Sequence, residues 1–251
     1  MFADPNGSGK STIINAVRAY RVSQIQVDFG IYVNADDIAN ALREDCFSFD
    51  SYQVKVALEE FAEVAENSGL INGDFPIEQF KDRFILTQNN VELIVPDAHE
   101  RLAQIIADFL RKKLLKERKK FSFETVFSHS SKLDIMREAA EAGYKVYLYF
   151  VSTESPEMNK YRVLVRKKQG GHDVDPDKIV KRYSRSLDLL FDAAQLAYQM
   201  YFFDNSRDGE NFKLFDHFKN AKGEKEWDHI NEEEVPFWFR KYYSSKVRVP
   251  K

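Results

Sequence analysis

The sequence predicts an α/β fold in which helices pack on a parallel sheet. Short runs of apolar and β-branched residues alternate with helical patterns along most of the chain, an order typical of parallel strands joined by right-handed crossovers. A glycine-rich stretch, residues 3–12, runs directly into a helical pattern. With 251 residues, of which 43% are hydrophobic, the chain can bury a core in one elaborated domain or two small ones.

The glycine-rich stretch, ADPNGSGKST, has the pattern of a phosphate-binding loop. Backbone N–H groups from Gly7 to Lys10 can surround a polyphosphate, because glycine permits the backbone angles and the close approach. The helix predicted over residues 10–21 directs its free N–H groups at the same anion. Two features depart from the pattern: Asp4 stands where it has glycine, and residues 1–3 leave only a short first strand. The alternative is a plain Gly/Ser turn at a helix start.

A second predicted strand, Ile31–Val33, leads to two neighbouring carboxylates, Asp36 and Asp37. Ligands bind at the carboxyl ends of parallel strands, so these side chains are candidates for chemistry. They also fit a helix start, as a cap and an acidic residue in the first turn. Both interpretations stay open at this point.

Residues 47–96 are predicted to be an insertion, with a helix over 52–67 and a hairpin over 84–95 that turns at Asn89–Asn90. It contains no catalytic constellation, and we interpret it as a cap, a partner-facing subdomain or a structural elaboration. A long helix over 97–120 follows, and its basic end is typical of a solvated helix terminus.

The remaining elements continue the alternation of strands and helices. A strand over residues 121–125 brings Glu124 and Thr125 to the rim of the sheet, and a glycine ends the helix that follows it. The other predicted elements are helices over 131–143, 155–168 and 176–200, strands over 145–151 and 201–204, a hairpin near Lys222–Gly223 and an aromatic segment, 237–239, that covers the core.

The segment 160–185 is locally basic and is interrupted at Gly170–Gly171. One interpretation is a helical lid that closes over a nucleotide and brings an arginine to the transferred phosphate. The alternative is an exposed pair of charged helices. The neighbouring His172 has no second set of ligands and does not indicate a metal site.

Composition excludes several classes of protein. A net charge of −3 argues against general binding to nucleic acids or membrane surfaces. The single cysteine, Cys46, leaves no disulfide framework and no zinc-cysteine cluster. No apolar stretch is long enough to span a bilayer, and no signal peptide is visible. We therefore expect a cytoplasmic protein.

Taken in order, the motifs resemble those of the zeta-toxin family of P-loop kinases. The resemblance runs from residue 3 to about residue 206, interrupted by the insertion. The motifs that carry it are Pro5 to Thr12, Asn34-Ala35-Asp36, Phe123-Glu124-Thr125, Gly143-Tyr144, Arg166 with Gly170-Gly171-His172-Asp173-Val174, Arg182-Tyr183 with Arg185-Ser186-Leu187, and Asp204-Asn205-Ser206.

This resemblance implies a P-loop kinase-like, three-layer core with a five-stranded parallel sheet, whose first strand is truncated here. It divides the chain into residues 1–46 with the phosphate loop and base strand, the insertion 47–96, the rest of the core at 97–206 with a lid at 155–185, and a tail at 207–251 that packs on the core.

The resemblance also implies roles for single residues. ATP would be held by Asn6, Gly7, Ser8, Gly9, Lys10, Ser11 and Thr12, and Mg²⁺ by Ser11. Asp36 matches the catalytic base that accepts the proton of the acceptor hydroxyl. Lys10, Arg166 and Arg182 match the cations around the transferred phosphate, with Arg162 an alternative to Arg166. Glu124 and Thr125 match the acceptor side of the site.

The expected activity is ATP-dependent phosphorylation of a hydroxyl on a small acceptor, such as the nucleotide sugar UDP-N-acetylglucosamine. An antitoxin protein is an expected partner. The competing interpretation is a degenerate or truncated nucleotide-binding module that acts through partner binding, since Asp4 would repel phosphates and the short strand would leave its neighbours unpaired. A nucleic-acid kinase or binding protein is a third and weaker alternative.

Overall fold

The computed structural model describes residues 1–251 except 74, 171–173, 208, 222, 229–230 and 248–251. The chain divides into two compact units, one formed by residues 1–27 and 124–251 and the other by residues 28–123. The predicted insertion, 47–96, lies wholly within the second unit. Of the predicted features, Gly171, His172, Asp173 and Lys222 lie outside the described residues.

The first unit is built on a sheet in which the short β1 (Phe2–Asp4) is an inner strand. All three residues of β1 are buried, and the strand pairs in parallel with β8 on one side and β9 on the other, so that Phe2 lies opposite both Glu124 and Tyr149. The sheet continues through β10 to the antiparallel strands β11 and β12. The strands are β8 (Phe121–Val126, of which Glu124–Val126 belong to this unit), β9 (Tyr147–Ser152), β10 (Gln199–Asp204), β11 (Lys213–Ala221) and β12 (Glu224–Trp227).

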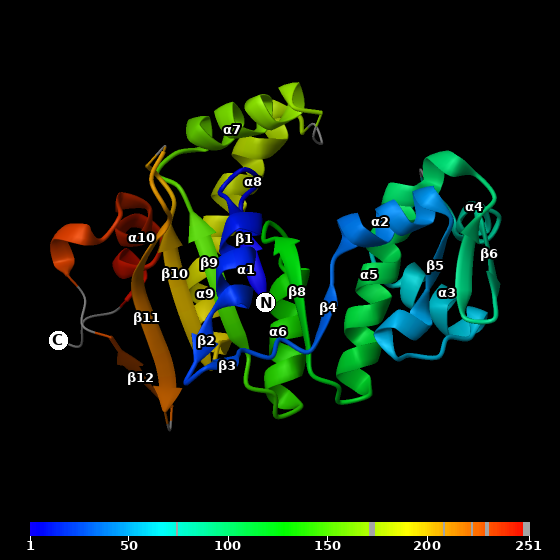
Figure 1. Ribbon diagram of the computed structural model, residues 1–251, viewed down its shortest axis with the longest axis horizontal. Coiled ribbons are helices and arrows are strands. Elements are labelled where there is room, and N and C mark those ends of the chain that lie inside the picture. Colours follow the sequence, from blue (N-terminus) through cyan, green and yellow to red (C-terminus); the bar gives the residue numbers. More distant parts are fainter. Residues whose placement is uncertain (74, 171–173, 208, 222, 229–230, 248–251) are drawn as a thin grey trace. The chain divides into compact units, whose positions relative to one another are not determined.

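Helices cover both faces of this sheet, which gives the three layers that were predicted (Figure 1). Successive side chains of a strand point to opposite faces. In β10, Met200 and Phe202 therefore join the large apolar cluster, while Phe203 joins Ile13 on the face covered by α1. The helices are α1 (Lys10–Ala19), α6 (Ser131–Glu141), α7 (Pro156–Lys168), α8 (Pro176–Asp188), α9 (Leu190–Leu196) and α10 (Phe237–Tyr242); a small ribbon joins β2 (Arg21–Val22) to β3 (Ile25–Gln26).

The helix predicted over residues 176–200 is wrong at its end. It divides at Leu189 into α8 and α9, and the chain is already extended from Ala197, where Tyr198 donates its N–H to the carbonyl of Val146. Met200 is fully buried in β10. Pairing with β9 along the whole of β10 overrides the local helical pattern there.

The C-terminal segment packs into the core of the first unit. Trp238 and Phe239 are 1% and 4% exposed and belong to the large apolar cluster, as predicted for a core cover, whereas Phe237 is exposed. The indole Nε1 of Trp238 donates to Asp204 Oδ1 at 2.9 Å, and the N–H of Phe237 donates to Glu154 Oε1 at 2.9 Å. These bonds fix α10 to the carboxyl end of β10 and to Glu154 in the segment before α7.

The second unit contains a parallel pair and a small antiparallel sheet. The strand β4 (Ile31–Val33) pairs with residues 121–123 of β8. The predicted hairpin is present as β6 and β7, but its turn falls at Gln88–Asn89, where both φ angles are positive, one residue earlier than predicted. The elements are α2 (Ala35–Glu44), β5 (Cys46–Ser48), α3 (Leu58–Glu66), α4 (Ile77–Lys81), β6 (Phe84–Thr87), β7 (Asn90–Leu93), α5 (His99–Lys116) and the 3-10 turns Phe49–Tyr52 and Pro96–Ala98.

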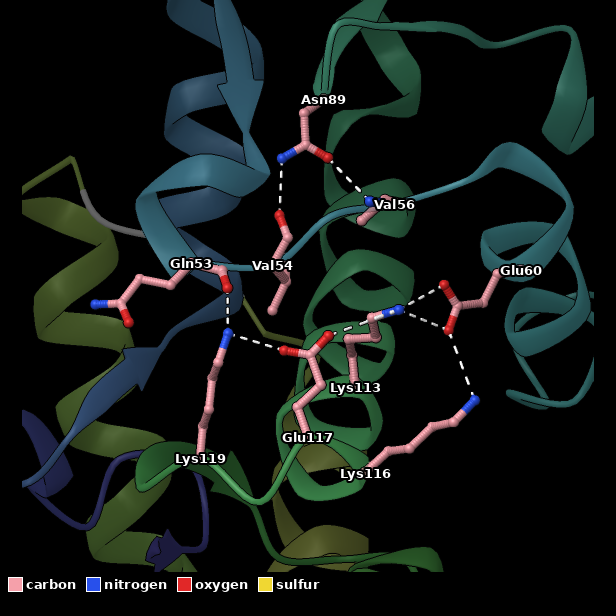
Figure 2. A network of polar contacts seen from close by, with 9 residues as sticks. All are labelled: Gln53, Val54, Val56, Glu60, Asn89, Lys113, Lys116, Glu117 and Lys119. Atoms are coloured by element: carbon pink, nitrogen blue, oxygen red, sulfur yellow. Dashed lines mark hydrogen bonds and ion pairs between the residues drawn. The ribbon is translucent and has the colours of Figure 1, made fainter.

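The helix predicted over 52–67 is shorter because a distant side chain holds its first residues extended. Asn89 accepts the N–H of Val56 at 3.0 Å and donates to the carbonyl of Val54 at 2.8 Å (Figure 2). The preceding Gln53 has a φ of 57° and its carbonyl accepts from Lys119. The long helix predicted over 97–120 likewise ends at Lys116, and Arg118 follows with a φ of 55°.

Phenylalanine rings fill the core of the second unit. Phe61 is fully buried and lies edge to face against Phe109, with 5.2 Å between ring centroids. Phe49, Phe80 and Phe84 surround the same ring at 5.4–5.9 Å. These rings come from α3, α4, α5, β6 and the turn after β5, so the predicted insertion shares a core with α5.

Candidate phosphate-binding site

The residues between β1 and α1 form a tight loop that only glycine fits at two positions. Gly7 and Gly9 have φ angles of 83° and 97°, a region that other residues rarely adopt. Ser8 donates its N–H to the carbonyl of Pro5 at 3.2 Å, and α1 begins directly after Gly9. The first turn of α1 contains no acidic residue, and Ser11 and Thr12 are exposed there. This loop and helix start can receive an anion.

Lys10 contacts two carboxylates below the loop. Its Nζ lies 2.6 Å from Glu124 Oε2 and 3.6 Å from Asp4 Oδ1. All three side chains are largely buried, with exposed fractions of 17%, 13% and 4% for Lys10, Glu124 and Asp4. The structure therefore brings together the predicted phosphate-binding lysine, one predicted acceptor-side residue and the residue that departs from the loop pattern.

Asp4 has an unusual proton affinity. The pKa of its carboxyl is raised to about 7: burial raises it most and the charge of Glu124 adds to the increase, while the ammonium and backbone N–H groups of Lys10 favour the charged form. Its Oδ1 is buried without a hydrogen-bond partner among the described residues. Asp4 does not have a positive φ, so the backbone at this position does not require glycine. The carboxylate is thus partly neutral near pH 7.

Two asparagines that were not predicted as site residues contact the loop from outside. Asn159, on α7, donates to the carbonyl of Asn6 at 2.7 Å and to Ser8 Oγ at 3.1 Å. Asn205, after β10, donates to the carbonyl of Ser8 at 2.8 Å. Asn205 belongs to a motif that was noted in the sequence, whereas no local pattern marks Asn159, which is more than 150 residues from the loop.

The predicted arginines are on two helices, Arg162 and Arg166 on α7 and Arg182 on α8. Arg182 donates to Asn6 Oδ1 at 3.1 Å, and Arg162 donates to the carbonyl of Asn205 at 2.7 Å. Arg166 is exposed in the last turn of α7. Thr125 is half-buried at the end of β8, where its hydroxyl donates to the carbonyl of Val126.

Asp36 lies in the second unit, in the first turn of α2, and is exposed. The cap of this helix is Asn34, whose side chain accepts the N–H of Asp36 at 2.8 Å. The interpretation of the acidic pair as cap plus first-turn acid is therefore wrong about the cap. Asp36 and Asp37 are both first-turn acids, which the helix dipole favours, and this leaves the carboxylate of Asp36 available to a ligand.

The second unit also has an open pocket of about 600 Å³, a volume typical of small-molecule sites. Tyr32, Ser51, Tyr52, Lys119 and Lys120 line it, with Gly30, Ile31 and Gln53. It lies at the start of β4, whereas Asp36 follows the end of that strand. Among the described residues, no group of three or more His, Cys, Asp or Glu side chains is arranged to hold a metal ion, and no helix has the length and apolarity to cross a membrane.

Comparison with solved structures shows what this fold resembles. A chain in the crystal structure of AvrRxo1-ORF1:AvrRxo1-ORF2 with sulphate ions matches all of this chain with a TM-score of 0.53 and 16% sequence identity. The likeness shows a shared fold, the P-loop kinase-like α/β fold that the sequence predicted. The predicted resemblance to zeta-toxin-like P-loop kinases therefore holds for the fold. This chain spans 65% of the AvrRxo1 chain.

Two further comparisons have lower scores. A chain of the PezAT chromosomal toxin-antitoxin system of Streptococcus pneumoniae has a TM-score of 0.44 and 13% identity over 84% of this chain and 70% of that one. AvrRxo1-ORF1:-ORF2 with ATP has a TM-score of 0.47 and 16% identity over all of this chain and 65% of that one. No protein-family model matches the sequence, and a search of curated proteins found no match.

Proposed function

We propose that the protein transfers the γ-phosphoryl group of ATP to a hydroxyl of a small acceptor. The phosphate loop supports this proposal most strongly. Its two positive-φ glycines, the start of α1 and the nearby Lys10 and Arg182 combine the backbone donors and cations that polyphosphates require. We infer that Lys10 exchanges its contacts with Asp4 and Glu124 for the β- and γ-phosphates when ATP binds.

The residues present fit a magnesium ion that is held mainly by the substrate. Mg²⁺ keeps several water ligands and binds proteins through few side chains together with substrate phosphates. The exposed Ser11 hydroxyl at the start of α1 supplies such a ligand. When bound, the ion would neutralise charge on the β- and γ-phosphates.

In the proposed reaction, the acceptor oxygen forms a bond to the γ-phosphorus, the bond between that phosphorus and the bridging oxygen breaks, and ADP leaves. Asp36 accepts the proton of the acceptor hydroxyl. Arg182, with Arg162 or Arg166, stabilises charge on the group in transit.

The family resemblance supports a nucleotide sugar such as UDP-N-acetylglucosamine as the acceptor, with Glu124 and Thr125 on the acceptor side. The neighbour with the TM-score of 0.53 was crystallised as a complex of AvrRxo1-ORF1 with AvrRxo1-ORF2, which supports a protein partner for this chain. The family resemblance in the sequence makes that partner an antitoxin. We assign the reaction to the cytoplasm, in keeping with the single cysteine.

Labelled ATP tests this proposal. Purified protein should bind Mg·ATP and phosphorylate an acceptor in a panel of nucleotide sugars or a metabolite extract. Lys10→Ala should abolish ATP binding, and Asp36→Asn should lower the transfer rate by about 10²–10⁴-fold. The matched controls are Lys55→Ala, at an exposed lysine, and Asp37→Asn, at the neighbouring first-turn acid, which should both retain transfer.

The competing function is a module that binds a partner without catalysis. The two carboxylates against Lys10 favour it, because they occupy the lysine that a kinase needs for phosphate. A wild-type protein that neither binds ATP nor transfers phosphate, but retains a partner, would establish this second function and rule out the first.

A further inference from the structure

The side chain of Asn159 is fully buried beside the phosphate loop, and its polar atoms are all used. Its carboxamide nitrogen donates to the Asn6 carbonyl and to Ser8 Oγ. Its oxygen accepts from the hydroxyl of Thr153, which is itself fully buried. A buried carboxamide with each group satisfied is held in one orientation. It can therefore impose that orientation on the loop.

The bonds made by Asn159 and Asn205 determine where two N–H groups of the loop point. In a planar trans peptide, the C=O and N–H groups point in opposite directions. Asn159 binds the carbonyl of Asn6, so the N–H of Gly7 points away from α7. Asn205 binds the carbonyl of Ser8, so the N–H of Gly9 points away from the segment that follows β10. Each N–H group is thereby directed away from the asparagine that holds its peptide unit, and loop N–H groups of this kind can donate to an anion.

The glycines make this close contact possible. A Cβ on Gly7 would overlap the backbone of Asn159, and a Cβ on Gly9 would overlap the Asn205 amide. Both positions also have a φ that disfavours other residues. The asparagines are in turn supported, since Arg162 binds the Asn205 carbonyl and the N–H of Asn205 binds the Ser152 carbonyl at 2.9 Å.

We propose that Asn159 and Asn205 are positioning residues that hold the phosphate loop in its anion-binding conformation before the ligand arrives. The ligand class is the phosphate chain of a nucleoside triphosphate, and to this extent the inference rests on the proposed function. By fixing the two carbonyls outward, the asparagines spare the ligand the free-energy cost of ordering the loop.

Asn159→Ala and Asn205→Ala test this proposal with two measurements. The first is the dissociation constant of Mg·ATP and of magnesium triphosphate by calorimetry, which should rise about tenfold or more in each variant. The second is amide hydrogen exchange of residues 6–9 in the ligand-free protein, which should become faster. The control is Met136→Ala, a buried change on α6 of the same unit, which lowers stability without touching the loop.

The outcomes separate this inference from the proposed function. If wild-type protein binds both ligands and both variants bind them as tightly as wild type, the inference is wrong and the proposed function stands. If Met136→Ala loses as much affinity for the two ligands as the asparagine variants, the inference is also wrong, because a general loss of stability would then explain the weaker binding. If wild-type protein binds neither ligand, both proposals fail. Should Asn159→Ala not fold, the half-buried Asn205 provides the test alone.

Discussion

Asp4 places a carboxyl group under the loop, at a position where the phosphate-loop pattern has glycine. A fixed negative charge there would repel a bound phosphate by about 1 kcal/mol at 4 Å in water and by about 4 kcal/mol at an effective dielectric constant of 20. The charge is not fixed, however, because burial raises the pKa of Asp4 to about 7. The repulsion should therefore change across the physiological pH range.

We accordingly expect ATP affinity to depend on pH through Asp4. At pH 8 Asp4 is mostly ionised, and Asp4→Asn should tighten ATP binding by about tenfold, corresponding to about 1.4 kcal/mol. At pH 6 Asp4 is mostly protonated, and the two proteins should bind ATP more alike. Titration calorimetry at both values measures this, and comparison with the variant cancels the titration of ATP itself. An equal ratio of affinities at both values would contradict the prediction.

The same group should affect stability with a definite sign. The pKa of Asp4 is raised in the folded state above its ordinary value of 3.8. The folded protein therefore holds the proton more tightly, and the stability this provides is present below about pH 4 and is lost as pH rises to about 7. Asp4→Asn should consequently stabilise the protein more at pH 8 than at pH 5, by about 1.4 kcal/mol for each pH unit between pH 5 and the folded pKa of about 7. Urea unfolding at both pH values measures the difference, and Asp134→Asn, at an exposed acid, should show no such trend.

At the scale of elements, one buried ring of α3 joins the other elements in the core of the second unit. Phe61 of α3 contacts rings from α4, α5, β6 and the turn after β5. Because this ring is fully buried, Phe61→Ala should lower the free energy of unfolding by about 3–5 kcal/mol. Phe237→Ala, at an exposed phenylalanine of the other unit, is the control and should change it by less than about 0.5 kcal/mol. Chemical denaturation followed by circular dichroism distinguishes the two, and equal effects would show that the cluster does not stabilise this unit.

Local patterns were sufficient for elements whose shape is set by neighbouring residues. The strand Ile31–Val33, the hairpin after Phe84 and the helix that stops before Gly143, whose φ is 85°, could all be read from the sequence. The errors have a different cause. Asn89 holds residues 54–56 extended from more than 30 residues away, and β9 draws Met200 into a strand. Neither contact is visible in a local pattern.

The same distinction between local patterns and long-range contacts applies to the candidate site. The loop, Lys10 and the acidic pair after β4 lie in short motifs and were predicted. The salt bridge between Lys10 and Glu124 joins residues 114 positions apart, and the bond from Asn159 to Asn6 joins residues 153 apart. Such contacts depend on how the strands are ordered in the sheet, which single-residue patterns do not specify.

At the scale of the whole molecule, the C-terminal helix α10 should stabilise the fold through a hydrogen bond to a residue 34 positions earlier in the chain. Trp238→Phe removes the indole donor to Asp204 Oδ1 and keeps most of the buried ring. Losing one partner of a buried hydrogen bond costs about 1–3 kcal/mol, and thermal unfolding should show this loss. Asp204 keeps its bond from the Ser206 hydroxyl in this variant. The control is Trp227→Phe, at a half-buried indole. If Trp238→Phe loses no more stability than this control, the bond from Trp238 to Asp204 does not stabilise the protein.

The position of β1 between two strands that follow much later in the sequence affects when the site can form during synthesis. Its three residues are synthesised well before their strand partners, which begin at residue 124 and residue 149. The side chains that contact the loop follow later still, at residues 159, 182 and 205. Long-range pairing of this kind forms slowly and only when both partners are available. We therefore expect the nascent chain to remain unable to bind nucleotide until residue 205 has been synthesised and has left the ribosome.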